Sequence, residues 1–190
     1  MDIVEAILLR KSIRAYKSDP VPRKILEEIL ETALRAPSWA NTQAWEFIIV
    51  GGEKLQELKK TLTDRMREVP HPDIPFPMKY AEPYRTRHRN LGRKVLEVQG
   101  IDRKDREKRR WWRIQMTTFF DAPNAIIISI DRSFYHMDNF SNVWAPLSCG
   151  LVAMTITLLA TSHGLGTCLE VAPLAYPDII RRYWESQIRS

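Results

Sequence analysis

A short basic segment, Arg10-Lys11-Ser12-Ile13-Arg14, places three cations and a hydroxyl group within five residues. Guanidinium groups bind phosphate oxygens through paired N–H donors, and a serine hydroxyl adds a neutral donor. The segment therefore indicates a site for a phosphate or a polyol phosphate. A short solvated basic loop has the same composition, so the spacing leaves both interpretations open.

A second segment, Pro37-Ser38-Trp39-Ala40-Asn41-Thr42-Gln43, offers hydroxyl and amide groups beside the aromatic rings of Trp39 and Trp45. Such a mixture suits a planar heteroaromatic ligand, which needs hydrogen bonds at its edge and packing on its face. An Asx-rich turn around a buried tryptophan would look the same. Both interpretations stay open on the segment alone.

Other catalytic chemistries find little support in the residue pattern. The four histidines are scattered, without the spacing of metal ligands, and no metal site is predicted. Cys149 and Cys168 form neither a disulfide framework nor a four-cysteine zinc site. Cys168 is a candidate nucleophile or a small buried strand residue. The sequence has no glycine-rich phosphate loop, so nucleotide binding would depend on side chains.

Hydrophobic periodicity predicts the elements that position these segments. Helices are expected over residues 2–9, 22–35, 53–66, 79–99, 103–118, 142–163 and about 173–183. Strands are expected over residues 46–50, 125–130 and 165–171. The spacing of Asp2 and Glu5 is typical of a capping box, and Pro22 suits the first position of the second helix.

Two apolar stretches indicate the core. The run at 125–130 predicts a strand buried on both faces. The stretch from Ala145 to Ala160 is too short, and too often interrupted by Ser and Thr, for a membrane span. It is therefore expected to form the central helix of the fold.

Composition sets the broad class of the protein. The chain has 190 residues, 44% of them hydrophobic and 27% charged, which is typical of one globular domain and excludes a wholly disordered chain. The first residues carry acids where a signal peptide has bases. A reduced, soluble protein of the cytoplasm is therefore expected.

The net charge of +6 comes from one part of the chain. Residues 79–113 contain 13 basic and 5 acidic residues, a local charge of +8. This segment is interpreted as a solvated helical excursion whose aromatic residues line a ligand pocket. It also suits an acidic substrate or a nicotinamide phosphate, and Trp111-Trp112 leaves a nucleic-acid surface as a further alternative.

The ordered motifs resemble the nitroreductase family of FMN-dependent oxidoreductases. The family shares an Arg-x-Ser-x-Arg run after the first helix, an Ala-Pro-Ser-x-x-Asn-x-Gln-Pro-Trp loop and a Gly-Leu-Gly-Thr-Cys turn after a long helix. This chain has these motifs at 10–14, 36–45 and 164–168. The segment Phe119-Phe120-Asp121-Ala122-Pro123 is also similar to the family pattern. The resemblance covers nearly the whole chain.

The resemblance implies an α+β fold, with a small, mostly antiparallel sheet surrounded by helices and a long central helix. Residues 1–190 would form one such domain, with a basic helical excursion at about 70–118. It also implies a homodimer with two FMN sites at its interface. Nucleic acid and membranes are not expected among its partners.

The resemblance also implies site residues. The FMN phosphate and ribityl chain would be held by Arg10, Lys11, Ser12 and Arg14. The flavin ring would be reached from the other subunit by Pro37, Ser38 and Asn41, with Gln43 nearby. Backbone groups around Leu169 and Glu170 would approach the flavin N5 edge, and Gln115 would offer an amide to the pyrimidine edge. Arg14 is the candidate cation near the flavin N1.

The implied activity needs no protein nucleophile, because the chemistry takes place at flavin N5. NAD(P)H would reduce the cofactor, and a nitroaromatic, a quinone or a related small electron-poor acceptor would then take its place in a ping-pong mechanism. A flavin-dependent dehalogenase on the same fold is the near alternative. A degenerate, non-catalytic protein that binds flavin or nucleic acid is the alternative from another class.

Two departures from the family pattern stand out. Ala44 replaces the usual proline before Trp45, which is expected to loosen that turn. The sequence ends at Ser190, whereas family members usually continue through a further strand, a basic residue at the FMN phosphate and an arm around the partner. A short C-terminus is therefore expected, with weaker FMN binding and a weaker dimer if Ser190 is the native end.

Overall fold

The computed structural model describes residues 1–77, 79–135 and 143–188, with the backbone alone described beyond Tyr183. One of the four histidines, His136, and the first residue of the helix predicted over 142–163 lie outside these ranges. By its contacts the chain forms two compact units. The first unit consists of residues 1–57 and 120–169, and the second of residues 58–119 and 170–190.

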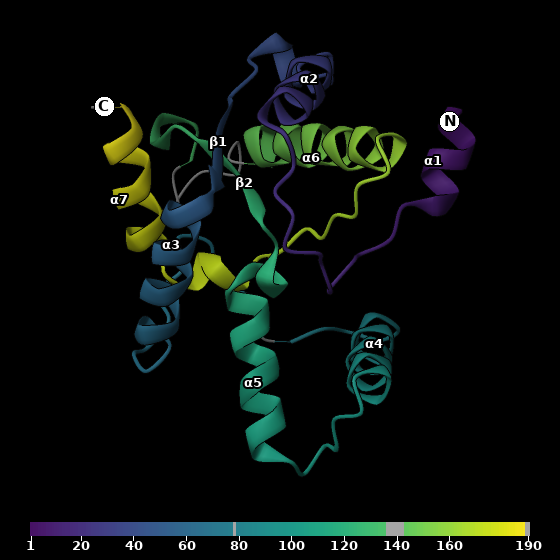
Figure 1. The fold of residues 1–190 in the computed structure, drawn as a ribbon, viewed down its shortest axis with the longest axis vertical. Coiled ribbons are helices and arrows are strands. Elements are labelled where there is room, and N and C mark those ends of the chain that lie inside the picture. The colour runs from purple at the N-terminus through teal and green to yellow at the C-terminus, as the bar shows by residue number, and fades with distance from the viewer. Residues whose placement is uncertain (78, 136–142, 189–190) are drawn as a thin grey trace. The chain divides into compact units, whose positions relative to one another are not determined.

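The first unit holds the sheet and the long central helix. Its strands, β1 (Trp45–Gly51) and β2 (Asn124–Ile130), pair antiparallel, with Trp45 opposite Ile130 and Gly51 opposite Asn124 (Figure 1). Its helices are α1 (Ile3–Leu9), α2 (Arg23–Ala33) and α6 (Trp144–Ser162), with 3-10 turns η1 (Trp39–Asn41), η2 (Phe119–Asp121) and η3 (Arg132–Phe134). The expected α+β class with a small antiparallel sheet is confirmed for the described residues.

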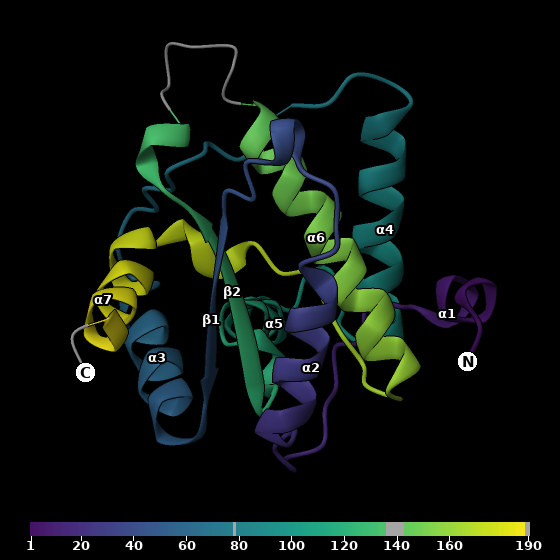
Figure 2. The ribbon, with the colours of Figure 1, turned by 90° about the horizontal axis from the view of Figure 1, so that it is seen from above.

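The core of this unit forms where α2, β1 and α6 meet. Ile29 of α2, Trp45 of β1 and Val152 of α6 are buried in one cluster. Small residues such as Ala33 and Ala160 let the helices approach closely, as Figure 2 shows for α2 and α6. By length and composition α6 would pass as a membrane span, but it packs against α1, α2 and both strands. It is the expected central helix.

Two predictions about strands need correction. Ile127 is the one buried residue of β2 and the other six are half-buried, so this strand is not buried on both faces. Residues 165–171 form no strand, since Thr167 alone makes a bridge, parallel to Ser12. A strand requires consecutive pairs with an extended partner, and these residues make a single pair.

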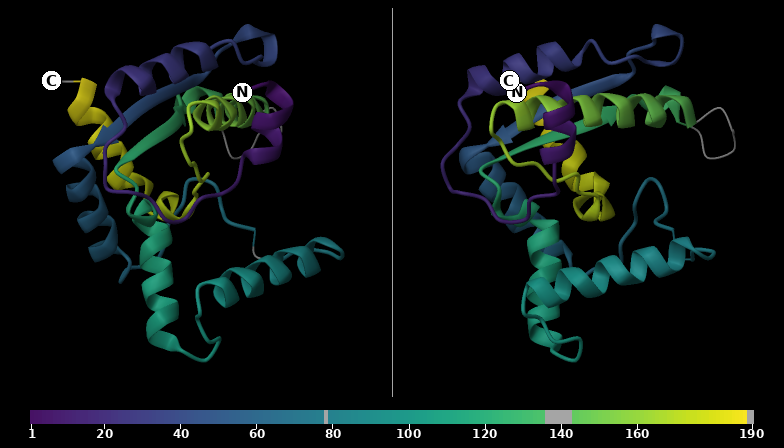
Figure 3. Two further views of the ribbon diagram at one scale, coloured as in Figure 1. Left: turned by 45° about the vertical axis from the view of Figure 1, so that its right-hand side comes forward. Right: turned by 90° about the vertical axis from the view of Figure 1, so that its right-hand side faces the viewer.

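The second unit is helical. It contains most of α3 (Gly52–Arg65), then α4 (Tyr84–Val98), α5 (Arg106–Thr117), the 3-10 helix η5 (Ala172–Ala175) and α7 (Pro177–Ile188). Leu58, Leu62 and Ile179 are fully buried, whereas α4 buries none of its side chains. Figure 3 shows α4 running nearly crosswise to α5. Within the basic segment, α4 and α5 are helical and α4 is largely solvated.

Capping groups and prolines explain where the helices begin. Asp2 accepts a hydrogen bond from the Glu5 amide at 2.9 Å, which confirms the predicted N-cap of α1. Pro22 caps α2 one position earlier than expected. The predicted helix over 79–99 begins only at Tyr84, after Pro83, and the predicted helix over 173–183 divides into η5 and α7. Pro177 begins α7 because a proline suits a helix start but not its interior.

A carboxylate on α7, Asp178, contacts charged groups from the end of α3 and from the chain that follows it. Asp178 pairs with Arg65 and lies 2.9 Å from His71 Nε2. The amide of His71 donates to the Ala175 carbonyl at 3.0 Å, and Arg181 pairs with Asp73 at 2.7 Å. These contacts attach the proline-rich segment 66–77 to η5 and α7.

Asp178→Asn should make the free energy of unfolding less dependent on pH in the acidic range. Burial opposes the ionisation of Asp178, but Arg65 and the hydrogen bond from His71 outweigh it and hold the pKa of this carboxyl below its ordinary value. A depressed pKa in the folded state gives stability that is present above the unfolded pKa and lost as pH falls through the folded pKa. Near neutral pH we expect the variant to lose about 1 kcal/mol, a value discounted for partial exposure.

Urea unfolding between acidic and neutral pH measures this dependence. The difference between the two proteins should shrink as the pH falls through the pKa of Asp178. Asp19→Asn is the control, because Asp19 has no hydrogen bond or ion pair to any described residue. A difference that stays constant with pH would contradict the assignment.

Candidate functional site

The predicted phosphate-binding segment lies against the turn that follows α6. Ser12 bridges Thr167, and the Ile13 amide donates to the Thr167 carbonyl at 2.9 Å. A Cβ atom at Gly166 would lie 2.9 Å from Ile13 Cγ1. Only glycine leaves enough room for this contact, so the Gly-Leu-Gly-Thr-Cys turn and the basic segment are fitted to each other.

The cations of this segment are not neutralised within the described part of the chain. Arg10 and Arg14 are half-buried and Lys11 is exposed, yet none of the three forms an ion pair with a described residue. The Arg14 guanidinium lies 5.8 Å from the centre of the Phe120 ring. Three neighbouring positive charges without a carboxylate favour an anionic ligand, which fits the phosphate of FMN.

Hydrogen bonds and ring stacking hold the polar loop on the N-terminal part of α6. The Trp39 amide donates to Ser148 Oγ at 3.2 Å. The rings of Trp39 and Trp144 stack at 5.9 Å, with 17° between their planes. Ser148 is 1% exposed and also donates to the Trp144 carbonyl at 2.8 Å. One buried hydroxyl therefore joins the loop to the helix.

The backbone of this loop presents the predicted ring-binding groups. Ala40, Asn41 and Gln43 have positive φ values of 49°, 55° and 45°. Asparagine tolerates this left-handed region, whereas alanine and glutamine adopt it at a cost of about 1 kcal/mol each. Gln43 Nε2 donates to Asn41 Oδ1 at 3.1 Å, and the Gln43 amide donates to Ser38 Oγ at 3.0 Å. The side-chain Nδ2 of Asn41 has no partner among the described residues and stays open to a ligand.

The two segments have different contacts around α6. The polar loop contacts Trp144 and Ser148 in the first turns of the helix, and the basic segment contacts Thr167 in the turn that follows it. Among the described residues no hydrogen bond or ring contact joins the two groups of predicted residues.

The remaining predicted residues have separate surroundings. Leu169 is 63% exposed. Glu170 Oε1 accepts hydrogen bonds from the amides of Val171 and Ala172, each at 3.0 Å, which orders the chain entering η5. Gln115 is half-buried on α5. Gln115 and Glu170 belong to the second unit, and their roles at a flavin stay predictions.

Cys149 does not present an activated nucleophile. Burial raises the pKa of the Cys149 thiol, which disfavours the thiolate. Cys168 Sγ lies 3.8 Å from the Leu169 carbonyl as a weak donor. Among the described residues no three His, Cys, Asp or Glu side chains gather at one place.

Sequence reasoning missed the residues that support the two segments. Ser148 and Trp144 hold the polar loop, and Phe120 lies beside Arg14. Ser148 carried a detectable signal, because a polar residue within an apolar helical stripe needs a hydrogen-bond partner when buried. Phe120 belongs to the segment 119–123 that resembles the family pattern, but nothing in the sequence predicted that its ring lies beside Arg14, since its left-handed backbone at φ 52° results from the tertiary turn.

Ser148→Ala should loosen the polar loop. The Trp39 amide would lose its acceptor in a partly buried place, which costs about 1–2 kcal/mol of stability. We expect a lower unfolding midpoint and a weaker near-ultraviolet signal from the Trp39–Trp144 pair. Ser162→Ala is the matched control, because Ser162 on the same helix bonds only the Leu159 carbonyl, at 2.7 Å. Equal effects of the two substitutions would contradict this role.

The amino-acid sequence of this chain is similar to those of known proteins. The chain is 32% identical to the nitrobenzene nitroreductase of Ectopseudomonas oleovorans over 167 residues, which cover 85% of this chain and 70% of that protein. It is 30% identical to the 4-nitrobenzoate reductase of Pseudomonas putida over 183 residues, which cover 96% of this chain and 78% of that protein.

The fold of this chain is also similar to that of a solved structure. The crystal structure of the FMN and NADPH-dependent nitroreductase NfnB from sphigopyxis sp. strain HMH matches with a TM-score of 0.88 and 27% identity. The match covers 96% of this chain and 80% of that chain. The profile of the nitroreductase family matches residues 7–185, a range that includes both predicted segments and the turn after α6. The chain belongs to the nitroreductase family.

Proposed function

We propose that this chain is an FMN-dependent oxidoreductase that uses NAD(P)H to reduce nitroaromatics, quinones or related electron-poor acceptors. The observation that carries the proposal is the set of uncompensated cations at 10–14, held against the turn at Gly166 and Thr167. The relatives named as nitrobenzene and 4-nitrobenzoate reductases support the choice of acceptor class. The FMN and NADPH-dependent structural neighbour supports the choice of cofactors.

The chain's own residues would bind and orient the cofactor. Arg10, Lys11 and Arg14 would neutralise the phosphate, and Ser12 would add a hydroxyl donor. Packing of Arg14 beside Phe120 limits the positions that this guanidinium can take. When bound, FMN supplies the hydride chemistry, and a nearby positive charge increases its electron affinity.

We also propose a homodimer in which each site takes residues from both chains. Exposed apolar side chains support it, since Leu147, Leu151 and Met154 form one stripe of α6 at i, i+4 and i+7. Val4 and Leu8 of α1, which packs against α6, are also exposed. Large exposed apolar patches on soluble proteins usually mark interfaces.

Because the two segments are not in contact within one chain, a dimer would be needed to complete the ligand site. The polar loop contacts the first turns of α6, whereas the basic segment contacts the turn that follows this helix. In a two-fold dimer, the basic segment of one chain can face the polar loop of its partner, so that Pro37, Ser38, Asn41 and Gln43 reach a ligand held by the other chain. We further propose a cytoplasmic location, supported by the free thiols of Cys149 and Cys168.

The first expected result is spectroscopic. Purified protein mixed with FMN should show a flavin spectrum that NADH or NADPH bleaches under anaerobic conditions and that a nitroaromatic or a quinone restores. Restoration by a halogenated aromatic with release of halide, and not by nitro compounds, would favour the dehalogenase. Bound FMN that neither dinucleotide bleaches would favour the non-catalytic alternative, and failure to bind FMN would end the proposal.

The second expected result tests the shared site. Arg10→Gln/Arg14→Gln damages the basic segment, and Asn41→Asp damages the polar loop while keeping a residue that tolerates positive φ. Each variant alone should lose most of its activity. Randomly mixed dimers should recover about a quarter of the wild-type activity, because half of the dimers are mixed and each contains one intact site.

Controls separate the dimer from the activity. Subunits are exchanged by co-expression with two different tags, and FMN content is measured beside NAD(P)H oxidation. Each variant mixed with itself should show no recovery. If both segments of a site came from one chain, every site in a mixed dimer would be damaged and activity would stay low. That outcome would contradict the shared site without affecting the proposed activity.

A further inference from the structure

A buried aromatic ring lies beside one cation of the basic segment. The side chain of Phe120 is 4% exposed, and the Arg14 Cζ atom lies 5.8 Å from the centre of its ring. Both residues belong to the first unit, although they are far apart in sequence. The negatively polarised face of an aromatic ring attracts a guanidinium group at this distance. Phe120 therefore holds Arg14 by an electrostatic contact.

This contact distinguishes Arg14 from the other two cations of the segment. The side chains of Arg10 and Lys11 have no ring contact, hydrogen bond or ion pair with a described residue. The Arg14 side chain contacts the Phe120 ring, and its Nη1 atom lies 3.4 Å from the Ser12 carbonyl oxygen. Neither contact brings a carboxylate to the guanidinium group. Arg14 is thus held in place and keeps its positive charge for a ligand.

The backbone that carries Phe120 is strained. Phe119, Phe120 and Asp121 have consecutive positive φ values of 60°, 52° and 58°. This left-handed region is unfavourable for residues other than glycine, and above all for bulky ones. Such strain persists only where the surrounding structure holds it, and it is concentrated at functional sites. The turn therefore indicates that the position of the Phe120 ring has a function beyond filling space.

Neighbouring residues hold this turn in place. Ala122 is 8% exposed, and β2 begins two residues later at Asn124. The Asn124 side chain accepts a hydrogen bond from the Val21 amide at 2.8 Å, and Asn124 pairs with Gly51 in the sheet. The start of β2 is therefore fixed, and so is the backbone just before it. A fixed turn gives the Phe120 ring a constant position beside the basic segment.

We propose that Phe120 is a positioning residue, whose ring holds the Arg14 guanidinium group in the place where it binds the negative charge of FMN. The inference rests on the proposed function, because it takes FMN as the ligand of the basic segment. A carboxylate in the same place would also order Arg14, but it would cancel the charge that an anionic ligand needs. An aromatic ring orders the cation and leaves that charge available.

A double-mutant cycle tests whether Phe120 acts through Arg14. Phe120→Leu keeps a buried apolar side chain but removes the ring, and should raise the dissociation constant of FMN about three- to tenfold. In the Arg14→Gln background the same substitution should change that constant by less than about twofold, because no cation is left to position. Titration of the apoprotein, followed by the quenching of flavin fluorescence, measures all four dissociation constants.

A matched control separates this effect from a loss of packing. Phe47→Leu makes the same substitution in β1 of the same unit, where the ring packs against the core around Ile29 and Trp45. This variant should lower the urea midpoint of unfolding, because it also removes part of a packed ring. Its affinity for FMN should stay within about twofold of the wild-type value.

Fluorination of the ring covers the case in which Phe120→Leu does not fold. Phe120→trifluorophenylalanine keeps the shape of the ring and removes the negative polarisation of its face. FMN should then bind about three- to tenfold more weakly, as in Phe120→Leu. Wild-type affinity in the fluorinated protein would mean that the ring only fills space, and would overturn the proposal.

The remaining outcomes are also distinct. Equal weakening by Phe120→Leu with and without Arg14 would mean that Phe120 acts independently of this cation, and so would contradict the proposed role. A loss of affinity in Phe47→Leu as large as that in Phe120→Leu would contradict it as well. Wild-type protein that binds no FMN would end the proposed function itself. Wild-type protein that binds FMN and is bleached by NAD(P)H, with additive effects in the cycle, would end only the role of Phe120.

Discussion

The packing of α6 is the constraint on which the first unit depends. Its small buried residues bring α2 and the two strands into one core around Val152 and Ile156. The same helix anchors the polar loop at its start through Ser148, and the chain after its end meets the basic segment at Thr167. The helix and the turn after it thus hold the two groups of predicted ligand-binding residues. In the proposed homodimer, each site would combine one group from each chain.

Local sequence signals predicted most of the fold. Periodicity and capping gave the helices and the two paired strands, with Asp2 as an N-cap and Gly164 at a positive φ after α6. The extent of pairing could not be predicted, because a strand exists only where a partner runs beside it. Residues 165–171 have the composition of a strand but meet the basic segment at a single bridge.

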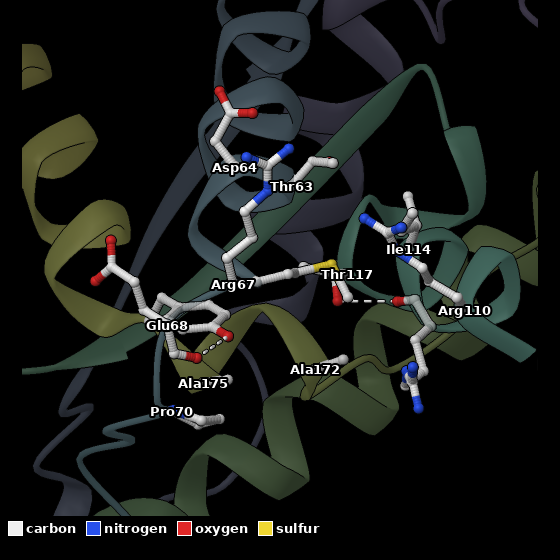
Figure 4. A pocket seen from close by; sticks show the side chains of 13 residues that line it. Thr63, Asp64, Arg67, Glu68, Pro70, Arg110, Ile114, Thr117, Ala172 and Ala175 are labelled. Carbon is white, nitrogen blue, oxygen red and sulfur yellow. Dashed lines mark hydrogen bonds between the residues drawn. The ribbon is translucent and has the colours of Figure 1, made fainter. Parts of the chain in front are cut away.

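The sequence predicted the motifs of the candidate site but not how they are positioned in the folded chain. Residue types identified the basic segment and the polar loop, and the family resemblance assigned them to one cofactor. Their different contacts around α6, the stacking of Trp39 on Trp144 and the left-handed turn at 119–121 all come from tertiary packing. The pocket in the helical unit, lined by residues between Thr63 and Tyr176, could not be predicted for the same reason (Figure 4). Arg67 and Arg113 are far apart in sequence, and their shared surroundings exist only after folding.

The close contact between Gly166 and Ile13 has a consequence for sequence change. The missing Cβ of one residue makes room for the branched side chain of the other, so the two positions share one volume. A larger residue at either position forces a smaller one at the other or moves the basic segment. These positions, 153 residues apart, cannot vary independently. Replacing Gly166 by a larger residue together with Ile13 by a smaller one would keep the three cations in place.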